Sequence, residues 1–243
     1  MDNALYVGLS RQLTLQRALD VAANNLANVD TVGFKLESLV VNTDPLDTPA
    51  PTNTPVQYVI DTQVARNFGS GPLEQTGNPF DLAVEGDGFF SVQTAAGVRY
   101  TRDGRFSVSA TGSLVDKNGN AVQSSGGSPI AIDIKKGTPS VGRDGTITQD
   151  GVQLGKISVV RFANRGSLSK EGLNTFSADG SSPPLPANDS LVRQGMVEHS
   201  NVTPVTEITN LISISRAYER IVQMMNASSD LSKQAVDRLG KVA

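Results

Sequence analysis

The single histidine of this 243-residue chain, His199, lies between Glu198 and Ser200. A serine hydrolase needs a serine, a histidine and an acid in hydrogen-bonding contact, and consecutive residues cannot make that arrangement by themselves. We therefore interpret His199 as a surface or interface residue that precedes a C-terminal helix. A hydrolase is kept as an alternative, and it predicts that His199→Ala abolishes cellular function.

Two short segments with acidic residues and glycine resemble loops that bind phosphate or metal ions. Residues 85–88, Glu-Gly-Asp-Gly, lack the lysine and the following helix of a phosphate loop, because Phe89 and Phe90 indicate a strand. Residues 116–120, Asp-Lys-Asn-Gly-Asn, lack the sixth-position glycine and the distal glutamate of a calcium loop. We predict a tight turn with positive φ at glycine for the first segment and a hairpin turn for the second.

The composition excludes several other classes of site. The chain has no cysteine, so disulfides and thiolate metal sites are excluded, and one histidine cannot make a multi-histidine metal site. A net charge of −3 without a basic run argues against nucleic acid as a partner. No segment reaches the roughly 18 apolar residues of a membrane span, and the N-terminus lacks the pattern of a cleaved signal peptide. We expect no catalytic residue, cofactor, metal ion, small-molecule substrate or membrane insertion.

Both ends of the chain have the hydrophobic period of an amphipathic helix. Apolar residues recur at three- and four-residue steps from the N-terminus to about residue 30, where Gly33 ends the pattern. A second pattern runs from about 205 to 243. The stripe residues of the first helix are Leu15, Ala18, Leu19, Ala22, Leu26 and Val29, extended toward the N-terminus by Leu5, Leu9 and Leu13. Those of the second are Ile214, Ala217, Ile221, Met224, Leu231, Ala235 and Val242, widened by Tyr218, Val222, Met225 and Leu239.

The middle of the chain, residues 34–203, has the pattern of a β domain. Four prolines make 43–56 a loop or extended linker, and short apolar alternations separated by turns follow. Asp103-Gly104 and Asn118-Gly119 both predict hairpin turns. The predicted strands lie around residues 81–85, 89–92, 99–108, 114–122, 130–134, 147–149 and 157–162.

These patterns predict a mixed, mainly β fold: an irregular β domain of short strands and hairpins, flanked by terminal helices that pair as a coiled coil. We expect residues 1–33 and 204–243 to form a helical assembly domain, 34–72 a linker or extended hairpin region, and 73–203 a β-rich outer domain. A pair of amphipathic helices leaves apolar surface exposed, which other copies would bury. The alternative is that both helices fold back onto the β domain.

The first helix has few charges, and its polar positions are mostly amides and hydroxyls. Amide side chains suit a helix surrounded by other helices, because they form hydrogen bonds without the desolvation cost of a buried ion. Since asparagine is a poor helix former, three of them near one end need a reason such as capping or contacts. The candidate assembly interface is Leu15, Leu19, Ala22, Asn24, Asn25, Leu26, Asn28, Ile214, Tyr218, Ile221 and Met225.

Several segments, in order along most of the chain, resemble the flagellar rod and hook protein family. Residues 23–35, Ala-Asn-Asn-Leu-Ala-Asn-Val-Asp-Thr-Val-Gly-Phe-Lys, are similar to its N-terminal signature, and 76–90, Thr-Gly-Asn-Pro-Phe-Asp-Leu-Ala-Val-Glu-Gly-Asp-Gly-Phe-Phe, to its second. Residues 100–106, 112–115, 194–202 and 217–219 follow in the expected order. The start, residues 1–7, and the length favour a proximal rod form over a distal rod or hook form.

The resemblance implies a structural subunit that polymerises through its terminal helices into a tube transmitting torque, with the β domain facing outward. It implies export by the flagellar apparatus without signal cleavage, assembly in the periplasm, and copies of itself and other rod proteins as neighbours. The alternative from a different class is a monomeric ligand-binding β module, which predicts a pocket with convergent polar groups and aromatic residues.

Overall fold

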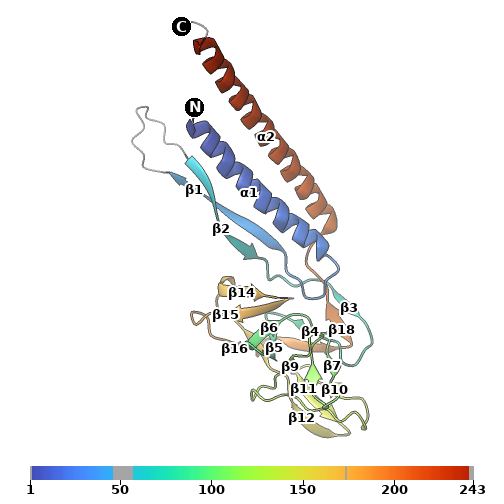
Figure 1. Cartoon of the computed structure of the whole chain (residues 1–243). Coiled ribbons are helices and arrows are strands. Elements are labelled where there is room, and N and C mark those ends of the chain that lie inside the picture. Colours follow the sequence, from blue (N-terminus) through green and yellow to red (C-terminus); the bar gives the residue numbers. More distant parts are fainter. Residues whose placement is uncertain (1, 46–56, 173, 241–243) are drawn as a thin grey trace. The chain divides into compact units, whose positions relative to one another are not determined.

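The computed structural model describes residues 2–45, 57–172 and 174–240, and the chain divides into two compact units (Figure 1). Unit 1 comprises Met1–Ala27, Glu37–Asn67 and Thr203–Ala243, and unit 2 comprises Asn28–Leu36 and Phe68–Val202. The chain therefore passes from one unit to the other four times, after residues 27, 36, 67 and 202.

Unit 1 contains the two long helices predicted from the sequence. Helices α1 (Asp2–Ala27) and α2 (Pro204–Gly240) lie side by side in opposite directions (Figure 1). Tyr218 Oη accepts a hydrogen bond of 3.0 Å from Gln12 Nε2 between the two helices. Helix α1 ends at Ala27, earlier than predicted, because a turn follows in which the amide of Thr31 donates to Asn28 O. Val242 of the predicted second helix lies outside the described residues.

A β-hairpin completes unit 1 and packs against α1 (Figure 1). Strand β1 (Glu37–Pro45) pairs antiparallel with β2 (Gln57–Arg66), with a bulge between Val40 and Val41. The prediction of a loop from residue 43 onward is wrong at its start, because the ladder continues to the pair of Pro45 and Gln57. A proline at the end of a strand costs the ladder little. The rest of that predicted loop, residues 46–56, lies outside the described residues.

Unit 2 consists of antiparallel sheets built from short strands. The largest has the order β14-β15-β6-β5-β9-β8-β7, and β13 joins it beside β5 and carries β16. Smaller sheets have the orders β10-β11-β12, β17-β4 and β18-β3. The bounds are β3 (Leu73–Gln75), β4 (Leu82–Glu85), β5 (Phe89–Thr94), β6 (Gly97–Thr101), β7 (Ser107–Val108), β8 (Leu114–Val115), β9 (Ala121–Val122), β10 (Ser140–Val141), β11 (Thr146–Gln149), β12 (Val152–Lys156), β13 (Val159–Arg161), η1 (Arg165–Ser167), β14 (Leu168–Glu171), β15 (Thr175–Ala178), β16 (Leu185–Pro186), β17 (Leu191–Gln194) and β18 (Met196–Glu198).

One of the two predicted hairpin turns is confirmed. Asn118-Gly119 connects β8 to β9, which pair at Val115 and Ala121. Asp103-Gly104 is not a hairpin turn, because β6 before it pairs with β5 and β15, whereas β7 after it pairs with β8. Gly104 is needed for a different reason: a Cβ there would lie 1.6 Å from the carbonyl oxygen of Leu82.

The other predicted strands form, apart from the one at 130–134. Strands β4 and β5 are consecutive but do not pair with each other, since β4 pairs with β17 and β5 with β6, β9 and β13. The predicted strand at 130–134 makes only an isolated bridge, between Ser113 and Ala131, and the residue before it, Pro129, makes another with Gln123. Pro129 has no N–H group, so a regular ladder cannot extend through it.

Two hydrophobic clusters form the interior of unit 2. One is mainly aliphatic and centres on β4, β5, β9, β11 and β17. The other is mainly aromatic, with edge-to-face contacts such as that of Tyr100 with Phe162, whose ring centroids lie 4.8 Å apart. All eight phenylalanines of the chain belong to unit 2. The phenylalanines are thus concentrated in the β unit, and the two helices contain no aromatic residue other than Tyr6 and Tyr218.

Candidate assembly site

The residues predicted as an assembly interface lie at different depths. Leu15, Ala22 and Asn25 are buried within unit 1. Tyr218 and Met225 of α2 face α1, where Tyr218 bonds Gln12 and a Cβ on Gly8 would lie 3.1 Å from Met225 Cγ. The half-buried members are Leu19, Asn24, Leu26, Asn28, Ile214, Tyr218, Ile221 and Met225. The structure therefore brings much of this set together inside the chain's own helix pair.

Asn25 joins three elements of unit 1 at the end of α1. Its side-chain oxygen accepts from the Glu37 amide at 2.9 Å, and its nitrogen donates to Glu37 O at 2.7 Å and to Glu207 Oε2 at 3.3 Å. The Glu37 carboxylate also accepts from Asn24 and, at 3.0 Å, from Arg66. These contacts supply the reason for asparagines in a helix, and they tie the starts of β1 and α2 to α1.

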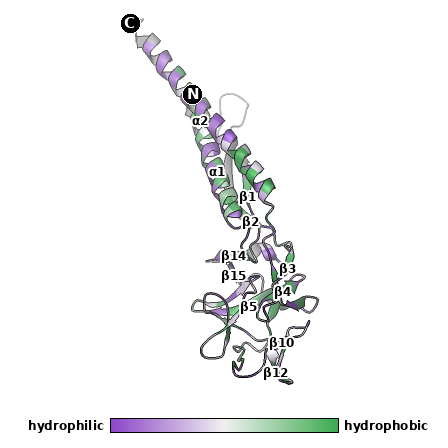
Figure 2. Cartoon of the chain, turned by 90° about the vertical axis from the view of Figure 1, so that its right-hand side faces the viewer, coloured by the Kyte–Doolittle hydropathy of each residue, from purple (hydrophilic) through white to green (hydrophobic). Residues whose placement is uncertain are grey.

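A different set of apolar residues lies exposed on the two helices. The α1 stripe is Tyr6, Leu9 and Leu13, and the α2 stripe is Val205, Ile208 and Ile212, each spaced by three and then four residues. Val205 is 75% exposed and Tyr6 61%. Figure 2 shows hydrophobic and hydrophilic residues interspersed along both helices. Such spacing on one helix face is typical of a contact with another helix.

A groove of about 490 Å³ lies along the first turns of α2. Small polar side chains make up most of its lining, and Glu207 is the one charged group among them, already bonded to Asn25. The lining residues are Val205, Thr206, Glu207, Thr209, Asn210 and Ser213. This surface can accept large side chains such as those of the α1 stripe without burying an unpaired charge.

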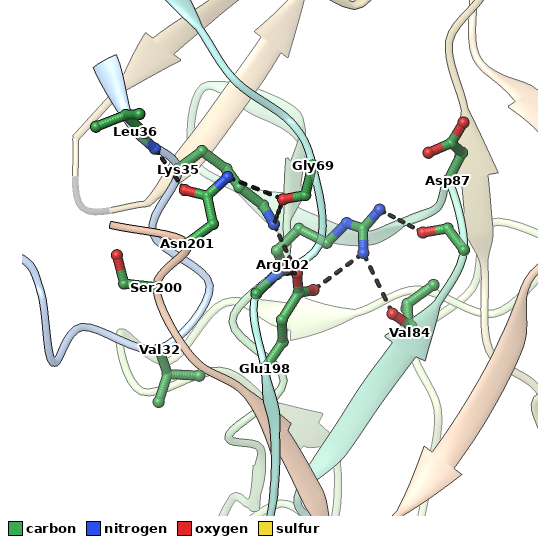
Figure 3. Close-up of polar contacts among 12 residues, drawn as sticks. Val32, Lys35, Leu36, Gly69, Val84, Asp87, Arg102, Glu198, Ser200 and Asn201 are labelled. Carbon is green, nitrogen blue, oxygen red and sulfur yellow. Dashed lines mark hydrogen bonds and ion pairs between the residues drawn. The ribbon is translucent and has the colours of Figure 1, made fainter. Parts of the chain in front are cut away.

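In unit 2, a buried cluster of charged residues lies where three distant segments meet (Figure 3). The Glu198 carboxylate contacts Lys35 Nζ at 2.6 Å and Arg102 Nη1 at 3.0 Å. All three residues are at most 2% exposed. Glu198 Oε1 also accepts from the amide of Gly71 at 2.9 Å, and Glu198 O accepts from the amide of Gly33 at 2.7 Å.

The cluster contains two cations for one carboxylate. Burial lowers the pKa of Lys35 and that of Arg102, and the Glu198 charge only partly offsets this effect. Backbone carbonyls help to hold both cations. Arg102 donates to Val84 O at 3.2 Å and Gly86 O at 2.6 Å, and Lys35 donates to Gly69 O at 2.9 Å (Figure 3). Removing Glu198 would therefore leave two uncompensated charges in a buried site.

Sequence reasoning missed this cluster. From its position beside His199, Glu198 suggests only the acid of a hydrolase. The available signal was a glutamate in an otherwise apolar strand, Met196-Val-Glu198, which is an unusual place for a charge unless it is paired.

The candidate chemical motifs form turns and a side-chain contact. The His199 side chain contacts Glu74, while Ser200 Oγ accepts from the amide of Val202. Gly86 has a φ of +106°, as predicted for residues 85–88. Asp116 Oδ1 accepts from the amides of Asn118 and Asn120, both at 2.8 Å, as in a hairpin turn.

A cavity of about 800 Å³ in unit 2 bears on the ligand-binding alternative. Its lining contains Arg143, Asp144 and Lys156 together with serines, prolines and aliphatic residues, and no aromatic side chain. The aromatic surface that this alternative predicted is therefore not part of the cavity. Within the described ranges, no three acidic or histidine side chains gather as a metal site. Neither helix, as far as it is described, has a stretch that could cross a membrane.

Three parts of the sequence match known families. Residues 5–35 match the family described as "Flagella basal body rod protein", residues 83–149 the "Flagellar hook protein FlgE/F/G D1 domain", and residues 193–238 the "Flagellar basal body rod FlgEFG protein C-terminal". These matches define the class as the hook and rod proteins of the flagellum, in agreement with the resemblance read from the motifs.

Full-length relatives narrow the class further. The chain is 49% identical to the flagellar basal-body rod protein FlgF of Caulobacter vibrioides, with 100% of both chains covered, and 36% identical to FlgF of Mesorhizobium japonicum, with 99% of both covered. It is 31% identical to FlgG of Bacillus subtilis over 98% of this chain and 99% of that protein. The chain belongs to the FlgF family of flagellar basal-body rod proteins. It is a structural subunit of the rod, not an enzyme.

Proposed function

We propose that the subunit enters the rod through the outer surfaces of α1 and α2, with copies of itself and neighbouring rod proteins as its partners. The observation that carries this proposal is the exposure of the α1 and α2 stripes on two helices that pack against each other through other residues. Burying a fully exposed large apolar side chain stabilises a contact by about 1.5–3 kcal/mol. The six stripe residues are 45–75% exposed, so each can contribute roughly half of that range or somewhat more.

The inner residues of the predicted interface, such as Leu15 and Asn25, act indirectly in this proposal. They hold α1, α2 and the hairpin in one unit and thereby present the stripes. We accordingly include the hairpin, residues 37–67, in the assembly domain, since it belongs to the same compact unit as the helices. Unit 2 would face outward.

The higher identity to the FlgF proteins than to FlgG supports a position in the proximal part of the rod. We further propose that the chain is exported through the flagellar apparatus without cleavage, assembles in the periplasm and transmits torque as part of a helical shaft. These finer statements rest on the family and on the motif resemblance.

The test is a single charge placed in the α1 stripe. Leu9→Glu should abolish incorporation into basal bodies in cells lacking the wild-type chain, because a carboxylate cannot be buried there without a partner. Val152→Glu is the matched control, because it places the same new residue at a 57% exposed apolar position outside the two helices. Far-UV circular dichroism of the purified variants checks that the two helices stay folded, so that a loss of incorporation is not caused by unfolding. Incorporation of Leu9→Glu at the wild-type level would contradict the proposal.

A further inference from the structure

The segments of unit 2 that lead to unit 1 are tied to one another by side chains. At three of the four passages between the units, the last or first residue on the unit 2 side is Leu36, Phe68 or Val202. Asn201 connects all three: its Oδ1 accepts from the Leu36 amide at 2.8 Å, and its Nδ2 donates to Gly69 O at 2.9 Å. Figure 3 shows Leu36, Gly69 and Asn201 together beside Glu198.

The buried charge cluster lies directly behind this connection and holds the same segments. Lys35 Nζ bonds both Gly69 O and Glu198, while Gly71 donates to the same carboxylate. The fourth passage, after residue 27, joins through the amide of Gly33, which donates to Glu198 O. Arg102 donates to Glu198 and also to the carbonyls of Val84, in β4, and Gly86, in the turn that follows β4, so it connects Glu198 to that strand and turn.

We propose that the cluster of Lys35, Arg102, Glu198 and Asn201 is a mechanical joint, which locks the three segments that carry the four passages, residues 28–36, 68–71 and 198–202, to the β unit so that they share one load. This inference rests on the proposed role of the subunit in transmitting torque. A load on one unlocked segment would have to be carried by that segment alone. In the observed arrangement, any of the three segments can move only if the buried ion pairs and their hydrogen bonds separate with it.

Force spectroscopy of the purified full-length chain tests the joint without depending on assembly. The chain has no cysteine, so introduced cysteines are unique attachment points. One handle is placed at Asp150, in the exposed turn between β11 and β12, and the other at Ala27 or at Thr203, just outside the first and the last passage. The lifetime under constant force is measured in both geometries.

Glu198→Gln should shorten the lifetime roughly tenfold in both geometries, because charge-assisted bonds to two buried cations become weaker neutral ones. Glu85→Gln is the matched control, since Glu85 pairs with Arg193 on the surface of the same unit at 2.7 Å, and it should change neither lifetime. A shorter lifetime with the handle at Thr203 only would show that the segments are held separately. That result, or no change in either geometry, overturns the joint.

Asn201→Ala keeps the test valid if Glu198→Gln does not fold. It removes the bonds to Leu36 and Gly69 without leaving a buried charge, and we expect a roughly fivefold shorter lifetime in both geometries. Failure of the joint would appear in this single-chain experiment, whereas failure of the proposed assembly surface would appear in basal bodies of cells carrying Leu9→Glu.

Discussion

Removing Glu198 should destabilise the protein far more than removing Lys35, although the two residues form one ion pair. Glu198→Ala leaves Lys35 and Arg102, both at most 2% exposed, as neighbouring buried cations, and the Gly71 amide loses its acceptor. Breaking a buried pair in this way costs about 3–5 kcal/mol. Because domains have a total stability of about 5–15 kcal/mol, the variant should be severely destabilised.

Lys35→Met has the opposite effect on the charge balance. It leaves Arg102 and Glu198 as a one-to-one pair, and Gly69 O still accepts from Asn201. The variant loses the ion pair with Glu198, but it also no longer buries the Lys35 ammonium group. The desolvation of that group, which lowers the pKa of Lys35, destabilises the wild-type chain, so the two effects oppose each other. We expect a change in the free energy of unfolding within about 1 kcal/mol.

The assay is urea unfolding of the purified full-length chain, followed by near-UV circular dichroism. This signal comes from the aromatic cluster of Tyr100, Phe162 and their neighbours in unit 2, together with the three tyrosines of unit 1, so it follows the unfolding of the whole chain. Glu85→Ala, which removes an exposed pair with Arg193, is the control and should cost less than about 1 kcal/mol. Equal destabilisation by Lys35→Met and Glu198→Ala would refute the reasoning from charge balance. If Glu198→Ala does not fold, Glu198→Gln is compared in its place.

Three further predictions concern other parts of the chain. Asn25→Ala should lower the free energy of unfolding by about 2 kcal/mol, because the buried amide and carbonyl of Glu37 lose their partner. Asn25→Asp should destabilise the chain at least as much, since a carboxylate cannot donate to that carbonyl. Urea unfolding followed by far-UV circular dichroism measures both variants. Gly104→Ala should cost about 3 kcal/mol or more in thermal unfolding, because its Cβ would overlap Leu82 O. The pKa of Lys35 is lowered in the folded chain, so the unfolded chain binds more protons than the folded chain just below pH ~10.5. The free energy of unfolding should therefore rise with pH in that range. Urea titrations at several pH values should show this rise for the wild-type chain and not for Lys35→Met.

The helices could be predicted from the sequence, but the faces they expose could not. Hydrophobic period identifies an amphipathic helix whatever covers its stripe. It does not say which apolar residues the chain's own hairpin and second helix will cover. Leu15 and Leu9 both belong to the periodic pattern of α1, yet Leu15 is buried and Leu9 is exposed. Only the packing of α1 against its neighbours separates an internal residue from a candidate contact with another subunit.

The β unit illustrates a second limit, in the meaning of glycine and of isolated charges. Asn118-Gly119 follows the local rule for a hairpin, whereas Gly104 is required by the backbone of Leu82, which is distant in sequence and invisible to a local rule. The charges of Lys35, Arg102 and Glu198 are likewise distant from one another along the chain. Their pairing depends on how segments distant in sequence pack together in unit 2, so no spacing rule could have found it.

The motifs that first suggested chemistry find their explanation in the same buried cluster. Glu198, the candidate acid beside His199, is instead the counter-ion of two cations. Residues 85–88, the candidate phosphate loop, place the Gly86 carbonyl 2.6 Å from Arg102. Four of the segments that carried the family resemblance, 23–35, 76–90, 100–106 and 194–202, thus each contribute a group to this one cluster. Polar residues that would define an active site on a surface here hold together the segments through which a rod subunit connects its two units.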